Sequence, residues 1–396
     1  SSDLPTRQAT IALAESNMLE VFVTSLDTSR IRGYFKGNLG AELSRRALPE
    51  NVSALTHAFP FDEILRQVAR ATNIRTLQNH FSISRVRRKI DVETSAFLDT
   101  NTRGVLGYED SCLETFRVAR SNGIQTTLDL QSAYWRVGAK LFREEELLQP
   151  SWSGTLPTRL LPQEYFEQKD SEIRLADKIL VASSFARRCL EENELSLHSS
   201  IHVIPYGSER TKNSLDEHSR GKRLKVLFVG SVGQLKGTSY FFEATRSKRL
   251  KDKIDVTVIG NRVGDSAQRD KELTRVNYIP SLPHSSIIEV MRQSDVLVFP
   301  SLFDGFGLVI LEALSAGIPV IASVNSGGPD VIRDGFNGWL VPIRNSDAIT
   351  ERLLELHDDR DLLEKMKHNA LSSSSEFGWE RYGEALMEVL LDKKNV

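Results

Sequence analysis

Cysteine is scarce in this chain of 396 residues, which contains only Cys112 and Cys189. The two lie far apart in the sequence, and neither has a second cysteine close enough to form a CxxC motif. The sequence therefore favours neither a disulfide framework nor a zinc site. This cysteine usage predicts a reducing, cytoplasmic compartment.

Long apolar runs are also missing. No stretch approaches the roughly 20 apolar residues that a membrane-spanning helix needs, and the segment 1–5 lacks the basic and apolar regions of a signal peptide. These absences predict a soluble protein that is at most peripheral at the inner face of a membrane. The chain begins without Met, in a turn-like sequence followed by a helical one, so we hypothesise that a first strand precedes Ser1.

An excess of charge of either sign is absent as well. The formal net charge of -2 argues against a surface built to bind nucleic acid, so no nucleic-acid partner is expected. The hydrophobic share of 40% and the charged share of 26% are typical of a globular protein. A length of 396 residues exceeds that of one ordinary core and predicts two domains.

Short apolar segments alternate with helical ones along the whole chain, which is the pattern of parallel sheets covered by helices on both faces. Helices are expected, for example, at 161–176 and 239–246. The clearest strands are 19–24, 126–130, 178–182, 201–204, 225–229, 255–259, 296–299, 319–322 and 338–341. The predicted fold class is α/β, with two doubly wound, Rossmann-like domains facing a cleft at the carboxyl ends of their strands.

The polar segment 206–223 separates the two series of strands and is the expected linker. It divides the chain into a first domain, 1–205, and a second domain, 206–375. The serine tract 372–375 is followed by a helical segment at 379–391. This end of the chain is either a loop and a plain surface helix or, in 376–396, a tail that crosses back to the first domain, and we expect the crossing.

The segment 299–313 has the composition of an anion site. A buried strand ends at Pro300, a turn with Gly305 and Gly307 follows, and an apolar helix starts near Leu308. The first turn of a helix has N–H groups without intrahelical partners, and these attract phosphate groups. Glycines in the turn allow the backbone to approach such a group closely.

Two carboxylates belong to the same segment. Asp304 lies on the turn and Glu312 about one turn into the helix, so both could line one cleft and contact a sugar and a ribose. The alternative is an acidic residue that favours the helix dipole, followed by an ordinary helical Glu. A short motif of this kind is a hypothesis until its context fits.

A second glycine-containing segment, 226–237, reads as a strand, a loop and a helix. Such a layout suits phosphate binding, with Lys236 as a point charge for a diphosphate. Its spacing fits neither the dinucleotide fingerprint nor the Walker loop. The alternative is a solvated surface lysine after a tight turn.

The segment PSLFDGFGLVILEALSAGIPVIAS, residues 300–323, resembles the signature of the retaining GT-B glycosyltransferases of family 4, the glycosyl transferases group 1. In that family a Glu is followed by seven residues and a second Glu, and here Asp304 and Glu312 occupy the two positions. The first acid is thus one methylene shorter. The loop 230–237 resembles the family's phosphate loop, with Ser231 where the family usually has Arg and Lys236 where it has Lys.

Two further blocks, 177–185 and 202–207, resemble the family in order and spacing, so the match is close over about 175–341 and loose elsewhere. The resemblance implies a retaining transferase of the hexosyltransferase type that needs neither metal nor cofactor. It would move a sugar from a nucleotide-diphosphate sugar to a hydroxyl group of a glycan, a lipid-linked molecule or a small molecule. The first domain would bind the acceptor and the second the donor.

The same resemblance implies the site residues. Asp304, Lys236 and Glu312 would be catalytic, and the donor base would be held by backbone groups near 278–282. The donor-binding set would comprise Gly230, Ser231, Lys236, Ile279, Gly305, Phe306, Gly307, Leu308 and Glu312.

The acceptor side gives weaker signals. Glu109, Asp110 and Asp129 lie in or after probable strands and would face the cleft in this architecture. Each of them would either contact the acceptor or cap a turn. The histidine that family members often carry in this region is not evident.

The segment 64–90 contains basic residues and no acidic residue: Arg66, Arg70, Arg75, Arg85, Arg87, Arg88 and Lys89. A basic, partly apolar segment of this kind binds anionic membranes, which would suit a lipid-linked acceptor. The alternative is a solvated helix face whose charges pair with acids elsewhere in the chain.

Two other functions fit the same fold. One is a different enzyme, such as a nucleotide-sugar epimerase or a phosphorylase, although no context for the cofactor lysine of a phosphorylase is recognisable. The other is a catalytically degenerate transferase that serves as a scaffold or regulatory subunit. Ser231 and Asp304, as departures from the family pattern, favour the latter alternative.

Overall fold

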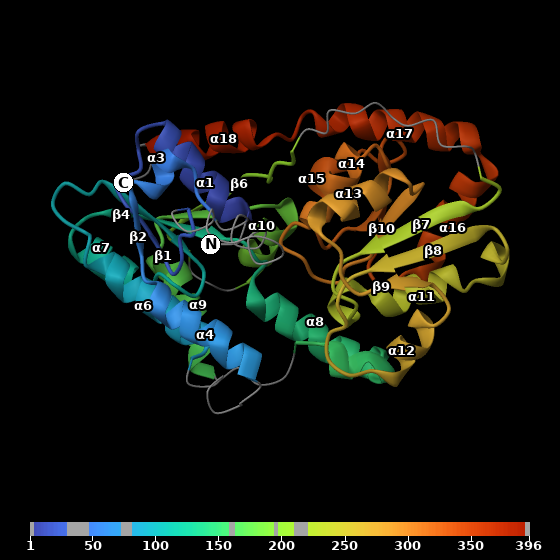
Figure 1. Ribbon diagram of the computed structural model, residues 1–396, viewed down its shortest axis with the longest axis horizontal. Coiled ribbons are helices and arrows are strands. Elements are labelled where there is room, and N and C mark those ends of the chain that lie inside the picture. Colours follow the sequence, from blue (N-terminus) through green and yellow to red (C-terminus); the bar gives the residue numbers. More distant parts are fainter. Residues whose placement is uncertain are drawn as a thin grey trace.

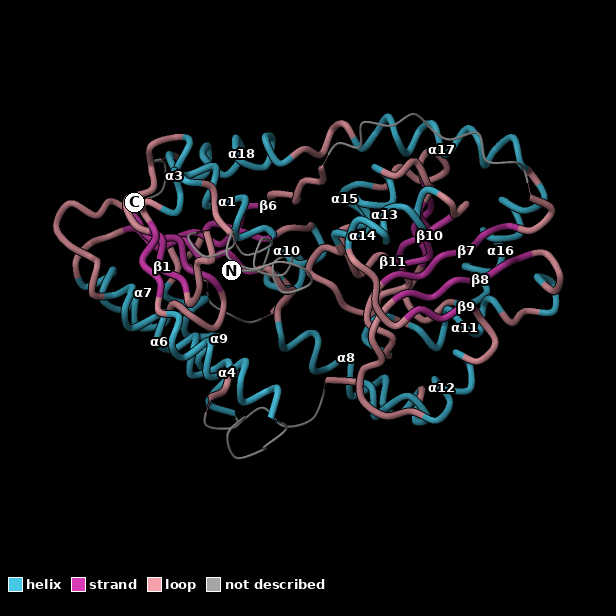
Figure 2. The backbone as a smooth tube through the Cα atoms, in the orientation of Figure 1, coloured by secondary structure: helices cyan, strands magenta, loops and turns pink. Residues whose placement is uncertain are grey.

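The computed structural model of the chain describes residues 4–29, 47–72, 81–157, 163–193, 197–209 and 221–392. Within these ranges the strands form two main sheets, which lie in separate halves of an elongated molecule (Figure 1). Helices surround both groups of strands (Figure 2). The predicted α/β class is therefore confirmed.

All described strands of the first half pair in parallel. They form a four-stranded sheet in the order β3-β4-β5-β6 and a separate pair, β1-β2. The strands are β1 (Phe22–Thr24), β2 (Thr56–Ala58), β3 (Gly104–Tyr108), β4 (Gln125–Leu130), β5 (Lys178–Val181) and β6 (Ser200–Val203). The helices are α1 (Leu4–Glu15), α3 (Glu50–Ser53), α4 (Pro60–Thr72), α6 (Ile83–Ser95), α7 (Leu113–Ser121), α8 (Trp135–Leu148), α9 (Gln163–Leu175) and α10 (Ser184–Glu191), with the 3₁₀ turn η2 (Pro150–Thr155).

The second half holds a six-stranded parallel sheet. Its strands are β7 (Leu224–Val229), β8 (Ile254–Ile259), β9 (Asn277–Ile279), β10 (Val296–Phe299), β11 (Val320–Ser323) and β12 (Gly338–Val341). Its helices are α11 (Thr238–Thr245), α12 (Ala267–Leu273), α13 (His284–Arg292), α14 (Leu308–Ser315), α15 (Gly328–Val331), α16 (Ser346–Asp358), α17 (Arg360–Ser374) and α18 (Trp379–Leu391), with the 3₁₀ turns η3 (Gln234–Lys236) and η4 (Lys248–Leu250).

The order of this second sheet is β12-β11-β10-β7-β8-β9, so the chain moves outward from β7 in one direction and then, from β10, in the other. Every residue of β10 and β11 is buried, as expected for central strands covered by helices on both faces. In such a sheet the loops after the two strands that flank the reversal diverge and leave a crevice at their carboxyl ends. That crevice lies after β7 and β10.

Each predicted strand overlaps an observed one, but β2, β3 and β9 were not among the clearest sequence signals. β3 and β9 are edge strands of their sheets, and β2 belongs to a two-stranded pair. Since the three strands are only partly buried, their sequences need no continuous apolar run. The serine tract, a loop in the plainer alternative, completes α17, where Ser374 Oγ donates to Leu371 O at 2.8 Å.

Two neighbouring segments, around Ser208 and Phe377, connect the two halves of the molecule. Ser208 N donates to Phe377 O at 3.0 Å, after which α18 lies over the first half and packs against α1 (Figure 1). Lys178 Nζ on β5 donates to the carbonyl groups of Val389 and Asp392 at 2.7 Å each. Of the expected linker 206–223, residues 210–220 lie outside the described residues.

Candidate active site

The crevice of the second sheet brings together the two segments that the sequence analysis had singled out. The loop after β7 ends in η3, which carries Lys236, and the loop after β10 carries Asp304. Lys236 Nζ forms an ion pair with Asp304 Oδ2, and their side chains are 20% and 15% exposed. Lys236 Nζ also lies 5.3 Å from the ring centroid of Phe299. The ammonium group of Lys236 is therefore held between the loop after β10 and the ring of Phe299.

Two hydrogen bonds fix the turn that carries Asp304. Its backbone N–H donates to Asn325 O at 3.1 Å, and its Oδ1 accepts from the N–H of Phe306 at 3.1 Å. The short Asp side chain thus closes the turn with one oxygen and holds Lys236 with the other. The Phe306 ring is buried and packs edge-on against Tyr206, with ring centroids 5.2 Å apart.

Gly305 and Gly307 are both required by close packing. A Cβ atom on Gly305 would lie 2.2 Å from the carbonyl oxygen of Gln131 in the first half. Gly307 has a φ of 86°, and a Cβ atom there would lie 2.7 Å from the Phe299 ring. The space beside Gly305 is therefore filled by the backbone of the first half.

The start of α14 offers backbone donors toward the crevice. Among the described residues, no protein acceptor is recorded for the N–H groups of Gly307, Leu308 and Val309. The N–H of Phe306 differs because Asp304 already accepts from it. Three adjacent donors at the positive end of a helix favour an anionic group.

Glu312 lies on α14, and its partner is a residue that the sequence analysis did not single out. Glu312 Oε1 is 2.9 Å from His284 Nε2, and the two residues lie 28 positions apart in the sequence. His284 begins α13, which packs against α14. Only the pairing of these two helices brings the histidine to the acid, so no local spacing could have revealed it.

The remaining predicted donor residues lie in the loop after β7 and at the end of β9. Gly230 has a φ of 148°, and its N–H donates to Ile259 O at 2.9 Å. Ser231 follows it in the same loop and is partly exposed. Ile279 ends β9, and its carbonyl accepts from Gly260 N at 3.0 Å.

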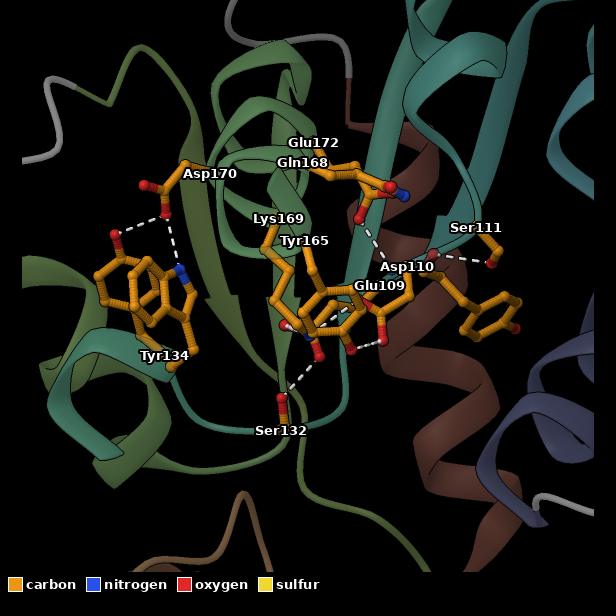
Figure 3. A network of polar contacts seen from close by, with 12 residues as sticks. Glu109, Asp110, Ser111, Ser132, Tyr134, Tyr165, Gln168, Lys169, Asp170 and Glu172 are labelled. Atoms are coloured by element: carbon orange, nitrogen blue, oxygen red, sulfur yellow. Dashed lines mark hydrogen bonds and ion pairs between the residues drawn. The ribbon is translucent and has the colours of Figure 1, made fainter. Parts of the chain in front are cut away.

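In the first half, Glu109 and Asp110 belong to a dense polar network (Figure 3). Lys169 Nζ pairs with Glu109 Oε1 at 2.8 Å and with Asp110 Oδ1 at 2.9 Å. Burial lowers the pKa of Lys169, but the charges of these two acids outweigh it and raise the pKa above its usual value. Ser132 Oγ, next to the residue that Gly305 contacts, donates to Glu109 Oε2 at 2.7 Å.

Glu172 holds the turn that carries these acids. It is fully buried on α9, and one of its oxygens accepts from the N–H of Asp110 at 2.8 Å (Figure 3). The other accepts from the N–H of Cys112 at 3.4 Å. Asp110 has a φ of 72°, which is uncommon for a residue with a side chain. Burial raises the pKa of Glu172 to about 7.

Asp129 differs from the expectation of a residue facing the cleft. It lies within β4 and is only 3% exposed, so its side chain belongs to the interior. Both faces of β4 are covered, since its last five residues are all buried, so a side chain on either face is buried.

The basic segment 64–90 contributes to ion pairs in the first half. Arg85 and Lys89 contact Asp62 at 3.3 and 2.8 Å, and Arg87 contacts Asp110 at 2.6 Å. Arg66 likewise pairs with Glu63 at 2.7 Å. These contacts fit the alternative of charges paired with acids elsewhere. Residues 73–80, with Arg75, lie outside the described residues. In the described ranges, no helix is long and apolar enough to cross a membrane.

The two halves also contact each other beside the crevice. Ser183 Oγ donates to Gly305 O at 2.6 Å. Asp330 on α15 accepts from the N–H of Ser184, with its two oxygens at 3.1 and 3.0 Å. Burial raises the pKa of Asp330, although the bonds from Ser184 oppose this shift. The first turn of α10 is thereby joined to the crevice loop.

Residues 209–372 match the sequence model of the family described as glycosyl transferases group 1. The match covers less than half of the chain and shows that this segment is similar to the group 1 glycosyltransferases. The matched segment contains the whole crevice after β7 and β10, including Lys236, Asp304 and Glu312.

Curated relatives agree with this assignment. A D-inositol 3-phosphate glycosyltransferase of Nocardia farcinica is 27% identical over 234 residues, which cover 54% of this chain and 52% of the relative. The protein of the same name from Streptomyces bingchenggensis is 30% identical over 178 residues, 41% of this chain and 39% of the relative. The chain thus spans about half the length of these relatives, or less.

Solved structures give the fold of the whole chain. Sucrose-phosphate synthase from Thermosynechococcus elongatus superposes with a TM-score of 0.64 at 17% identity, covering 98% of this chain and 92% of that chain. The Anabaena protein Alr3699/HepE, solved in complex with UDP, gives a TM-score of 0.61 at 14% identity, covering 98% and 97%. The chain has the GT-B fold.

Proposed function

We propose that the chain transfers the sugar of a nucleoside-diphosphate sugar to a hydroxyl group of an acceptor, with retention at the anomeric carbon and without metal or cofactor. The observation that carries the proposal is the meeting of Lys236 with Asp304 at the point where the sheet order reverses. The names of the relatives, D-inositol 3-phosphate glycosyltransferase, support the same reaction class.

The donor diphosphate would lie between Lys236 and the first turn of α14. The ammonium group and the N–H groups of Gly307 and Leu308 would stabilise the negative charge that develops as the diphosphate leaves. Because these donors are fixed before the reaction, little reorganisation is needed. Glu312 would contact hydroxyl groups of the nucleoside ribose.

In the single-step transfer that we propose, retention requires the acceptor hydroxyl to attack from the face that the leaving group departs from. The bond between the anomeric carbon and the phosphate oxygen breaks while the new glycosidic bond forms. The departing phosphate would accept the hydroxyl proton. Asp304 would orient the transferred sugar, and closure of the two halves would exclude water that otherwise hydrolyses the donor.

The acceptor would bind between the crevice and the turn that carries Glu109. This residue is partly exposed, and its neighbour in the network, Ser132, lies next to the backbone that contacts Gly305. A glycan, a lipid-linked molecule or a small alcohol would present the hydroxyl. Contact of the segment 64–90 with an anionic membrane is a separate prediction, which binding to phosphatidylglycerol vesicles tests.

The experiment is a thermal-shift screen against UDP-, GDP-, ADP- and TDP-sugars, followed by assays of donor hydrolysis and transfer. A ligand at 100 times its dissociation constant stabilises the protein by about 2.7 kcal/mol. We expect Lys236→Ala and Glu312→Ala to lose the shift and the turnover. Normal donor binding and transfer in both variants would refute the proposal.

Two outcomes of the same screen would favour the alternatives. Binding of a nucleotide sugar without hydrolysis or transfer to any acceptor would indicate a scaffold or regulatory subunit. Conversion of the donor into its epimer, with the nucleotide still attached, would indicate an epimerase.

A further inference from the structure

The helix α8 and the turn η2 form an arm between the two halves of the molecule (Figure 1). At the start of the arm, Trp135 stacks on Phe166 of α9, with ring centroids 4.3 Å apart. At its end, Ser266 Oγ from the second half donates to Ser151 O at 2.7 Å. The arm therefore packs against the first half at its start and is hydrogen-bonded to the second half at its end.

Glu145 on this arm is a fully buried carboxylate. Its oxygens accept hydrogen bonds from Gln234 Nε2 at 2.6 Å, Tyr240 OH at 2.7 Å and Arg344 Nε at 2.7 Å. A buried charge without such donors is strongly unfavourable. All three donors belong to the second half. The hydrogen bonds of Glu145 therefore connect α8, which starts in the first half, to the second half.

Gln234 is held by the arm at two points. Besides the bond from its side chain to Glu145, its backbone N–H donates to Thr155 Oγ1 at 2.8 Å. Gln234 is fully buried and opens η3, the turn that ends at Lys236. The position of the turn that presents Lys236 therefore depends on the arm.

The arm also contacts the other side of the crevice. A Cβ atom on Gly138 would lie only 3.1 Å from the ring of Phe303, the residue before Asp304. The ring of Phe142 packs edge-on against that of Phe303, with centroids 5.8 Å apart. One helix thus contacts both segments that carry the Lys236 and Asp304 pair.

Arg344 adds a specific contact between the second half and the arm. Its backbone has a φ of 63°, a conformation that residues with side chains rarely adopt. From there its guanidinium group reaches Glu145 and also donates to Leu141 O at 3.3 Å. The neighbouring Glu144 contacts Arg344 at 3.1 Å but is exposed, and among the described residues it makes no hydrogen bond to Gln234.

We propose that Glu145 is a positioning residue for the donor diphosphate. Through Gln234 it fixes η3, and so the ammonium group of Lys236, at the place where the diphosphate binds. The inference rests on the proposed function of the crevice. It assigns to a residue of the acceptor-side half a role in binding the donor.

The test compares Glu145→Gln with the matched control Glu144→Gln, which makes the same change one position away. Calorimetry measures the affinity of each full-length variant for UDP, GDP, ADP and TDP and for the corresponding monophosphates. We expect Glu145→Gln to weaken diphosphate binding by about tenfold while monophosphate binding stays within twofold. The control should match the wild type for both. In transfer assays, Glu145→Gln should raise KM for the donor more than it lowers kcat.

A second pair of variants covers the case in which Glu145→Gln does not fold. Thr155→Val removes the acceptor of the Gln234 N–H, whereas Thr155→Ser keeps a hydroxyl group there. The valine variant should lose diphosphate affinity selectively, and the serine variant should restore it. Equal losses for diphosphates and monophosphates would indicate a merely structural role and overturn the inference.

The results distinguish failure of the proposed function from failure of the positioning role of Glu145. If the wild type binds none of the four diphosphates, the proposed function and the inference both fall. If the wild type binds one and Glu145→Gln binds it equally well, only the inference falls.

Discussion

The ammonium group of Lys236 is paired with Oδ2 of Asp304, although the residues lie 68 positions apart in the sequence. The other oxygen of Asp304 closes its own turn by accepting from Phe306 N. Lys236 is therefore neutralised by an acid at the point where the proposed diphosphate would bind. The diphosphate would have to compete with, or join, this ion pair.

Asp304→Asn should strengthen the binding of a nucleoside diphosphate but reduce the transfer of the sugar. The amide keeps an oxygen for the Phe306 N–H but removes the negative charge beside Lys236. Because a partly exposed ion pair contributes up to about 1 kcal/mol, the affinity for a nucleoside diphosphate should rise by up to about fivefold. Transfer should fall because the sugar loses its carboxylate contact. Calorimetry and a transfer assay measure the two effects, and weaker diphosphate binding would contradict this account of the pair.

Gly305→Ala should separate the two halves. Its Cβ atom would lie 2.2 Å from Gln131 O, so the backbone of one half must move. Such overpacking costs about 1 to 3 kcal/mol. We expect a lower melting temperature and a larger radius of gyration in small-angle scattering. Gly221→Ala is the control, because the nearest atom to its Cβ would be 3.7 Å away. An unchanged radius for Gly305→Ala would show that the contact is not needed.

Glu172 should make stability depend on pH. Its folded pKa of about 7 lies above the ordinary value of 4.5, so between these values the folded state binds more protons than the unfolded state. The contribution of this group to the free energy of unfolding is therefore greatest below pH 4.5, decreases as the pH rises to about 7, and is constant above. Glu172→Gln lacks this titration.

The measurement is the melting temperature of wild type and Glu172→Gln across this pH range. The difference, variant minus wild type, should rise between pH 4.5 and 7 and then level off. A difference that does not change with pH would show that Glu172 has an ordinary pKa in the folded protein.

His284→Ala should weaken donor binding modestly. The histidine contacts Glu312 Oε1 at 2.9 Å, and without it the carboxylate is less well oriented toward the ribose. A contact of this kind at a partly exposed site contributes about 0.5 to 1.5 kcal/mol, which corresponds to a rise in donor KM of about twofold to tenfold. The control His357→Ala removes a histidine that instead contacts Asp358. A donor KM that is unchanged in His284→Ala would exclude this role.

The central strands were predictable from the sequence because burial on both faces requires continuous apolar runs. Val296–Phe299 and Val320–Ser323 are examples, and both were found within a residue or two. Edge strands such as Gly104–Tyr108 escape this criterion because they are only partly buried, so they need no continuous apolar run.

The donor crevice was predictable in part. Lys236, Asp304 and Glu312 stand in local motifs, whereas His284 and Glu145 reach the site only through packing between distant elements. Asp129 was expected to face the cleft, and its side chain is buried within β4. Local spacing reports which backbone turns can bind an anion, but not which distant side chains support them.

The most direct test of the proposed donor site is calorimetry of the wild type and Lys236→Ala with UDP, GDP, ADP and TDP. We predict that at least one of them binds the wild type and that Lys236→Ala binds it more than about tenfold less tightly, because a hydrogen bond to a charged group contributes about 1.5 to 3 kcal/mol. Equal affinities in the two proteins would contradict the assignment of Lys236 and of the crevice after β7 and β10 to the donor diphosphate.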